Sequence, residues 1–175
     1  MKVWCAAGVL WALFTSSASA LQVGDKWPTE LQLKDMQGRS WQARAWRGKV
    51  VVVGVWASWC EPCGSSMLEL DRVTGRSDNA EVAVVGISID KDASDVKTYL
   101  REHPIGFPIV HDDKHALVKR IGAKSVPSVY VIDKQGTLRH VFAGPRQQDN
   151  AKLRRVIAQL LTAKMPTKAG SVQSE

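Results

Sequence analysis

The chain has 175 residues, about the length of one domain, and its composition (45% hydrophobic, 23% charged) excludes a disordered or fibrous protein. Its net charge of +7 would allow nucleic acid or an anionic membrane as a partner. However, the basic residues are scattered, and the one dense cluster, Lys152, Arg154 and Arg155, has no interleaved aromatic residues. We therefore predict a solvated basic face and no nucleic-acid partner.

The first twenty residues have the pattern of a signal peptide. Lys2 supplies a positive charge, residues 3–14 form a short apolar stretch, and Ala18-Ser19-Ala20 has the small residues of a cleavage site. An uncleaved membrane anchor is the alternative, but spanning a bilayer takes roughly 20 apolar residues. We predict cleavage after Ala20 and a periplasmic protein, with a domain over residues 21–165 and a polar, frayed tail over 166–175.

Strand and helix signals alternate along the domain. Turn signals and short alternations in residues 21–48 predict a small hairpin leading into the domain. Strands are expected at residues 50–55, 82–87, 107–110, 128–132 and 138–142. Helices are expected from the cysteines onward, with Cys63, Met67 and Leu70 on one face, from the cap Asp92 to His103, from Asp112 or Asp113 to Gly122, and from the cap Asp149 through Leu161. This order predicts an α/β fold with a central mixed sheet flanked by helices.

Two of the three cysteines, Cys60 and Cys63, stand where the valine-rich run 50–55 ends and a helical pattern begins. Signal-peptide cleavage would remove the third, Cys5. In an oxidising compartment the remaining pair would form a disulfide unless something reduces it. A loop this short constrains little unfolded-chain entropy, so the spacing favours redox chemistry over structural stapling.

A cysteine at a helix N-terminus faces unpaired backbone N–H groups and the positive end of the helix dipole, which favour its thiolate. We therefore predict that Cys60 is the exposed attacking nucleophile, and that Cys63, one turn inside the helix, is the buried resolving cysteine. Pro62 suits the first helical turn because its missing N–H is not needed there. Glu61 places a negative charge beside the thiols, so we predict a moderately reducing pair and not a strong oxidant.

Several motifs occur together in this order: Leu31-Gln32-Leu33 with Gly38, Arg47-Gly48-Lys49, Trp56-Ala57-Ser58-Trp59-Cys60-Glu61-Pro62-Cys63, the strand and helix at 107–121, and Val126-Pro127. Over residues 22–163 the chain resembles the thioredoxin superfamily, and within it the TlpA/ResA-like family of exported thiol–disulfide oxidoreductases. The resemblance implies a thioredoxin-like fold with an N-terminal hairpin and a strand–helix insertion. It also implies client proteins with cysteine thiols or disulfides, a reducing role such as cytochrome c maturation, a membrane electron donor, and no small-molecule cofactor.

The same resemblance implies a substrate groove around the cysteines. Pro127 would be a cis proline lying against the pair, the Val126 backbone would pair with an extended client peptide, and Trp59, Glu61 and Pro62 would border the groove. From the sequence alone, a trans bond at Pro127 is the alternative, because only about 5–6% of X–Pro bonds in folded proteins are cis. Ordinary packing is the alternative for Trp59.

Three positions depart from the family pattern. Gly54 stands where relatives have a buried carboxylate or asparagine, Ser66 where this branch commonly has glutamate, and Leu68 where a helix-kinking proline is usual. Gly54 and Ser66 leave no obvious buried base for the proton of Cys63, so water or the Ser66 hydroxyl would have to serve.

Two other functions share this fold. A copper chaperone typically has Cys-x-x-x-Cys and a downstream histidine, whereas the present spacing is one residue shorter. A peroxiredoxin-related antioxidant protein needs a peroxidatic cysteine in a Thr-x-x-Cys setting, which is absent. We predict no metal site: the four histidines, His103, His111, His115 and His140, are scattered, and the turn expected at Asp112-Asp113 interrupts the 111/115 pair.

Overall fold

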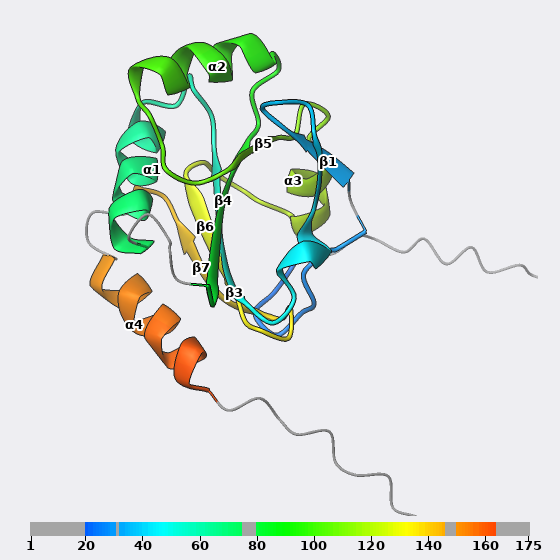
Figure 1. Ribbon diagram of the computed structural model, residues 1–175, viewed down its shortest axis with the longest axis vertical. Helices are drawn as coiled ribbons and strands as arrows, with labels where there is room; N and C mark the ends of the chain where they lie inside the picture. The colour runs from blue at the N-terminus through cyan, green and yellow to red at the C-terminus, as the bar shows by residue number, and fades with distance from the viewer. Residues whose placement is uncertain (1–19, 31, 75–79, 146–149, 164–175) are drawn as a thin grey trace, which may run out of the picture.

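A seven-stranded sheet in the order β2-β1-β5-β4-β3-β6-β7 forms the centre of the computed structural model (Figure 1). The structure describes residues 20–30, 32–74, 80–145 and 150–163. The strands are β1 (Gln32–Asp35), β2 (Ser40–Gln42), β3 (Val50–Trp56), β4 (Val82–Ser88), β5 (Ile109–His111), β6 (Ser128–Ile132) and β7 (Leu138–Ala143). The helices are the 3-10 helix η1 (Ala43–Trp46) and the α-helices α1 (Glu61–Thr74), α2 (Ala93–Glu102), α3 (Ala116–Ile121) and α4 (Asn150–Thr162).

The sheet is mixed, as predicted. β4 runs parallel to β3 and β5, whereas β6 is antiparallel to both β3 and β7. Every residue of β3 and β4 is buried, which explains why these strands read as nearly continuous apolar runs. The predicted thioredoxin-like α/β fold is confirmed.

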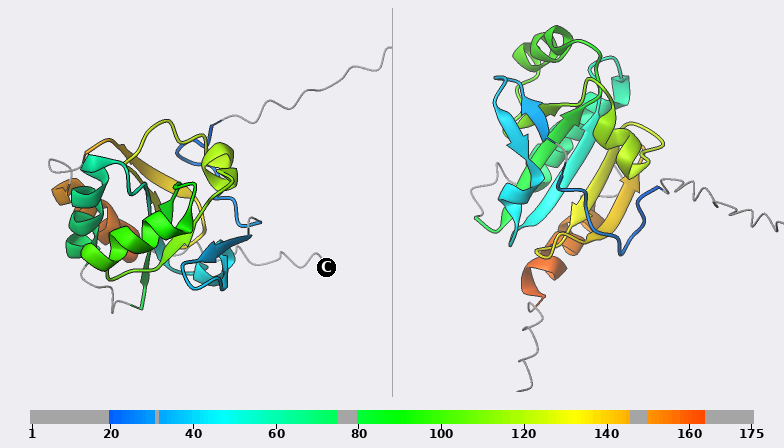
Figure 2. Two further views of the ribbon diagram at one scale, coloured as in Figure 1. Left: turned by 90° about the horizontal axis from the view of Figure 1, so that it is seen from above. Right: turned by 90° about the vertical axis from the view of Figure 1, so that its right-hand side faces the viewer.

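Alternate residues of β3 face two separate halves of the core. Val50, Val52 and Trp56 join a cluster that includes buried residues of α1, α2 and α4. Val51, Val53 and Val55 join a second cluster that includes residues of α3 and the N-terminal segment. Figure 2 shows the corresponding layers, with α1 and α4 on one side of the sheet and α3 on the other. The redox motif therefore follows a strand that is held on both faces.

The N-terminal hairpin does more than lead into the domain. β1 pairs antiparallel with β2, as expected, but it also pairs with β5, so that Lys34 lies opposite His111. The hairpin thus extends the central sheet at one edge. The strand expected at 107–110 is β5 and begins at Ile109, because Pro108 has no N–H to donate to a neighbouring strand.

α3 begins three or four residues later than predicted, at Ala116 instead of Asp112 or Asp113. Asp112 and Asp113 lie in a turn, and the helix begins at Ala116 after His115, whose φ of 54° is left-handed. Asp112 still fixes the helix start, because its carboxylate accepts hydrogen bonds from the backbone N–H groups of Ala116 (2.8 Å) and Val118 (3.0 Å). The predicted stop is confirmed, since Gly122 is left-handed with φ 64°.

The other helix boundaries agree largely with the spacing. α2 follows Asp92 and ends at His103, although the Asp92 side chain makes no capping hydrogen bond. Leu153 and Ile157 are the buried residues of α4, as its periodicity predicts. Asp149 and Leu31 lie outside the described residues, and so do residues 1–19 of the predicted signal peptide and the predicted tail from residue 164.

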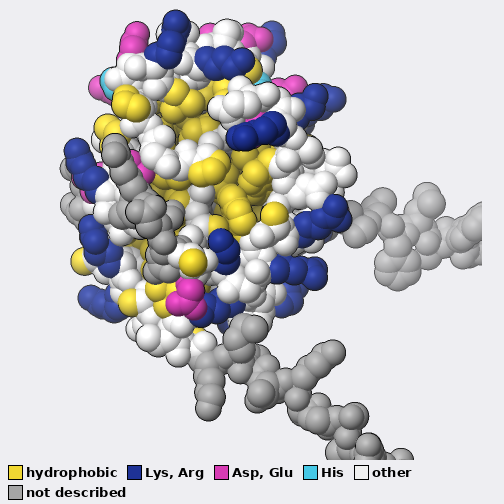
Figure 3. All heavy atoms as spheres, in the orientation of Figure 1, with side chains coloured by type: hydrophobic (Ala, Val, Ile, Leu, Met, Phe, Trp, Pro, Cys, Tyr) yellow, Lys and Arg dark blue, Asp and Glu magenta, His cyan; other side chains and the backbone are white. Residues whose placement is uncertain are grey.

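None of the helices in the described ranges combines the length and apolar character needed to cross a bilayer. Lys152, Arg154 and Arg155 are exposed on α4. On the face drawn in Figure 3, lysine and arginine side chains are spread among hydrophobic and neutral ones and do not gather in one basic patch.

Candidate active site

β3 leads directly to the cysteine pair. The strand ends at Trp56, the chain turns through Ala57, and Cys60 immediately precedes α1. Two backbone hydrogen bonds hold this turn, from Cys60 N–H to the Ala57 carbonyl (3.3 Å) and from Cys63 N–H to the Cys60 carbonyl (2.9 Å). Cys60 and Cys63 are joined by a disulfide, with their Cα atoms 5.3 Å apart. The structure therefore places a disulfide at the N-terminus of a 14-residue helix.

The two sulfur-bearing residues differ in accessibility, but less than predicted. Cys63 is completely buried, and Cys60 keeps only 8% of its surface exposed. The expectation of an exposed Cys60 is therefore wrong, because both cysteines pack into the core cluster beneath α1. Cys60 is nevertheless the side of the disulfide that solvent can reach.

The predicted groove residues differ in exposure. Trp59 is 68% exposed. Glu61 and Pro62, in the first turn of α1, are also exposed. The Val126–Pro127 peptide bond is cis, as the resemblance implied. Val126 is half-buried and packs against the core cluster that contains both cysteines, while Pro127 is buried.

Sequence reasoning missed Asp90, a buried carboxylate beside this motif. It is 1% exposed and follows β4 by two residues. Its carboxylate accepts hydrogen bonds from the Ser58 backbone N–H (3.0 and 3.1 Å), the Ser58 hydroxyl (2.6 Å) and the Ser88 hydroxyl (2.7 Å). Asp90 therefore ties the end of β4 to the turn that begins two residues before Cys60.

Two histidines bind the backbone carbonyls of Asp90 and of Ile89, the residue before it. His111 Nε2 donates to the Asp90 carbonyl (2.8 Å), and His115 Nε2 donates to the Ile89 carbonyl (2.9 Å). A carbonyl oxygen only accepts, so Nε2 carries a proton in both rings. In the described ranges no three histidine, cysteine, aspartate or glutamate side chains group closely enough to hold a metal ion.

The glycine at position 54 has a packing reason. A Cβ on Gly54 would lie 2.9 Å from Met67 Cε and 3.0 Å from Leu70 Cδ2, closer than carbon atoms approach in proteins. The space next to Gly54, where the family resemblance would place a polar side chain, is therefore filled from α1 by the Met67 thioether and by Leu70. A carboxylate at position 54 could enter only if Met67 moved.

Ser66 lies one turn after Cys63 on the buried side of α1 and is 2% exposed. Its hydroxyl has no hydrogen-bond partner among the described residues.

From α2, the Tyr99 ring packs against the Trp56 ring, with the ring centroids 5.2 Å apart. The Tyr99 hydroxyl occupies the place that a Cβ on Gly64 would take. Burial raises the pKa of Tyr99. Leu68 is half-buried within α1.

Comparison with known proteins identifies the family. The profile of the AhpC/TSA family matches residues 23–141, which is more than half of the chain. The chain belongs to the AhpC/TSA family. It is 24% identical over 143 residues to the thiol-disulfide oxidoreductase ResA of Geobacillus thermodenitrificans (strain NG80-2), covering 82% of each chain. It is 26% identical over 137 residues to the thioredoxin-like protein YneN of Bacillus subtilis (strain 168), covering 77% of this chain and 79% of that one.

Solved structures agree with this family assignment. The crystal structure of a putative thiol:disulfide interchange protein DsbE from Chlorobium tepidum has a TM-score of 0.76 and 27% identity, covering 81% of this chain and 99% of that one. The resemblance to thioredoxin-like proteins is thereby confirmed. This AhpC/TSA-family chain is an enzyme of the thiol–disulfide oxidoreductase type.

Proposed function

We propose that this enzyme exchanges its Cys60–Cys63 disulfide with the cysteines of client proteins, with Cys60 as the attacking nucleophile and Cys63 as the resolving cysteine. The observation that carries the proposal is the unequal burial of the disulfide. Cys60, immediately before α1, keeps 8% of its surface exposed, whereas Cys63, in the first turn of α1, is fully buried. A client can therefore form a mixed disulfide with only one of the two.

In the reducing direction, the Cys60 thiolate attacks a client disulfide, forms a mixed disulfide and releases one client thiolate. The Cys63 thiol then loses its proton, and its sulfur attacks Cys60 Sγ. This step closes the Cys60–Cys63 disulfide and releases the second client thiolate. Two electrons pass to the client, so a donor dithiol must reduce the pair again before the next cycle.

Two carboxylates near the pair support the reducing direction. Glu61 is exposed in the first turn of α1, and the buried Asp90 is bonded to Ser58. Negative charge disfavours a nearby thiolate, and strong oxidants depend on a heavily stabilised thiolate. Glu61 is screened by solvent, so the buried Asp90 carries most of this argument.

The client and the compartment are extensions of the same proposal. We infer periplasmic export from the signal-peptide pattern, with a membrane electron donor keeping the pair reduced. The ResA relative is named a thiol-disulfide oxidoreductase and the Chlorobium tepidum structure a thiol:disulfide interchange protein. Apo-cytochrome c is the client that the family resemblance favours. Trp59, exposed beside the disulfide, and Val126, beside the cis proline, would contact an extended client segment.

The test is a trapping experiment with an oxidised cysteine-containing client. Cys63→Ala should accumulate a mixed disulfide through Cys60, because no second thiol can resolve it, and Cys60→Ala should form none and reduce no client. Thiol trapping of the wild-type protein in cells should find the pair mainly reduced. Wild-type rates of client reduction by Cys60→Ala would overturn the enzyme mechanism, and a mainly oxidised pair in cells would overturn the reducing direction alone.

A further inference from the structure

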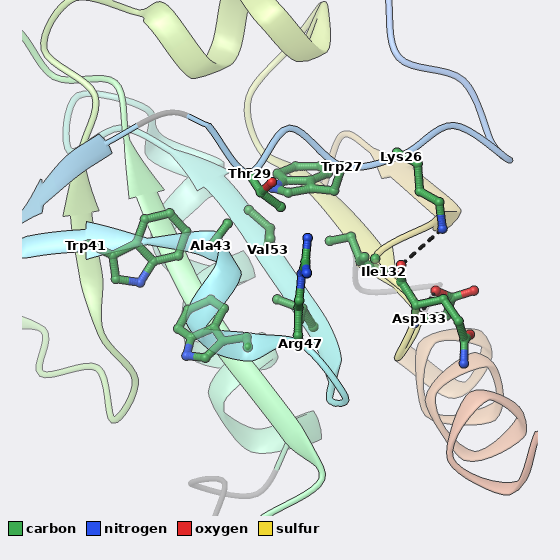
Figure 4. A pocket seen from close by; sticks show the side chains of 13 residues that line it. Lys26, Trp27, Thr29, Trp41, Ala43, Arg47, Val53, Ile132 and Asp133 are labelled. Atoms are coloured by element: carbon green, nitrogen blue, oxygen red, sulfur yellow. Dashed lines mark hydrogen bonds between the residues drawn. The ribbon is translucent and has the colours of Figure 1, made fainter. Parts of the chain in front are cut away.

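A cavity of about 400 Å³ lies at the other end of β3 from the disulfide. The N-terminal segment, the hairpin with η1, the first half of β3 and the turn after β6 enclose it (Figure 4). Val51 and Val53 form its floor, whereas Cys60 follows the far end of the same strand. The volume is within the range of small-molecule sites, roughly 300–1,000 Å³.

Rigid aromatic side chains line the cavity. Trp27 is 6% exposed and packs against Tyr130 with their ring centroids 5.6 Å apart. Trp41 and Trp46 meet edge to face at 5.0 Å and are half-buried, so their remaining surface is available to a ligand. These ring contacts hold the three indoles in place. A ligand could therefore enter the cavity without a rearrangement of its walls.

Of the three charged side chains among the described residues that line the cavity, Asp133 and Lys26 already have partners. Asp133 is neutralised, because its carboxylate accepts from Arg139 (2.6 Å) and from the backbone N–H groups of Gln135 and Thr137 (2.9 Å each). Lys26 Nζ donates to the Gln135 carbonyl (3.1 Å) and the Thr137 hydroxyl (2.9 Å). These groups are committed to holding the turn after β6.

Arg47 differs from its neighbours. Figure 4 shows its side chain reaching from the end of η1 into the middle of the cavity, between Val53 and Ile132 and toward Trp27. Arg47 is exposed, and among the described residues its guanidinium has no hydrogen-bond or ion-pair partner, although such a group offers five N–H donors in a planar fork. An apolar, aromatic cavity with a guanidinium that has no partner within the described part of the chain is complementary to an apolar anion.

We propose that this cavity binds a small aromatic carboxylate, with its rings between Trp27, Trp41 and Trp46 and its carboxylate held by the Arg47 fork. Carboxylates match the guanidinium geometry with two parallel hydrogen bonds. An apolar cavity of about 150 Å³ holds one benzene ring, so about 400 Å³ has room for two fused rings and the carboxylate. The proposal is independent of the redox function, since neither cysteine lines the cavity and its β3 residues, Val51 and Val53, lie in the half of the strand away from the disulfide.

The probe is 2-naphthoate, with the neutral 2-naphthamide as its shape-matched control. Calorimetric titration should show saturable binding of the acid and about tenfold weaker binding of the amide, which cannot form the charged pair. In NMR spectra the indole N–H signals of Trp27, Trp41 and Trp46 should shift, while that of Trp59 beside the disulfide stays in place. Oxidised and reduced protein should bind equally.

Arg47→Gln should weaken 2-naphthoate about tenfold and leave 2-naphthamide unchanged. Arg44→Gln is the matched control, because Arg44 is an exposed arginine of the same η1 helix that does not line the cavity. The proposal is overturned by absence of saturable binding in the millimolar range, by equal affinity for acid and amide, or by a shift confined to Trp59. The acid–amide comparison uses only wild-type protein and stands even where Arg47→Gln fails to fold.

Discussion

Replacement of Asp90 by asparagine separates the charge of this side chain from its shape. The carboxylate accepts from Ser58 through both the backbone N–H and the hydroxyl, and from Ser88 through its hydroxyl. Asparagine keeps one acceptor oxygen for Ser58, and its amide group can donate to Ser88. We therefore expect Asp90→Asn to fold, with a loss of about 1–2 kcal/mol in unfolding free energy from the weakened charge-assisted bonds.

The larger effect should appear on Cys60. Cys60 is two positions after Ser58, so their Cα atoms are at most about 7.6 Å apart, and we take roughly 10 Å for the separation of the carboxylate and the sulfur. At an effective dielectric constant of about 20, a unit charge at this distance is worth about 1.7 kcal/mol, and about half of that with better screening. Removing the charge should therefore lower the pKa of Cys60 by about one unit.

The assay is the ultraviolet absorbance of the Cys60 thiolate as a function of pH, in the reduced protein. The reduction potential, measured against glutathione buffers, should rise by up to about 30 mV, because the reduced form gains a more stable thiolate. Asp92→Asn is the matched control. Asp92 is an exposed aspartate two residues away whose side chain makes no capping bond.

An unchanged Cys60 pKa and potential in Asp90→Asn, together with a lower unfolding free energy, would refute this reasoning. Asp90 would then be a structural tie between β4 and the turn before Cys60 and nothing more. Equal shifts in Asp92→Asn would refute it as well, because they would show that burial of the charge is irrelevant.

Three further substitutions test the surroundings of the pair. Gly54→Ala should lower the unfolding free energy by about 1–3 kcal/mol in urea titrations, and by less in a Met67→Ala background, where the overlap with Met67 is gone and only the one with Leu70 remains. Ser66→Ala should raise the unfolding free energy by about 1 kcal/mol, because it removes a buried hydroxyl without a partner among the described residues. The same substitution should slow resolution of the mixed disulfide if that hydroxyl takes the Cys63 proton. Burial raises the pKa of Tyr130, so the phenol loses its proton at lower pH in the unfolded chain than in the folded one. The unfolding free energy should therefore fall above about pH 10, and Tyr130→Phe should reduce that fall in alkaline denaturation.

The sequence carries most of the fold because its signals there are local. The valines of residues 50–55 and the spacing of Leu153 and Ile157 depend only on which face of an element is buried, and both elements are where the pattern predicts. The pairing of β1 with β5 is different, because two short strands far apart in the chain contain no signal of their register. The start of α3 was also misplaced, since Asp112 caps it through a turn and not as the adjacent residue.

The candidate site divides in the same way. The spacing of Cys60 and Cys63 is enough to identify the cysteine pair from the sequence, and the resemblance of the chain to the family is enough to identify Pro127. Asp90 could not be found, because its partner Ser58 is 32 residues away and an aspartate after a strand is an ordinary turn residue. Only the tertiary structure brings the two together.

Gly54, Ser66 and the missed carboxylate Asp90 are connected. By the family resemblance, a polar group at position 54 would lie beneath the pair, where it could act on Cys63, the resolving cysteine of the proposed mechanism. In this chain Met67 and Leu70 fill that space, and the buried charge is on Asp90, which is bonded to the turn before Cys60. In the proposed mechanism this charge therefore lies beside the turn that carries the nucleophile Cys60, and Cys63 has the Ser66 hydroxyl or water for its proton. This arrangement predicts that a buried carboxylate after β4, and not a polar group at position 54, sets the reducing strength of the pair.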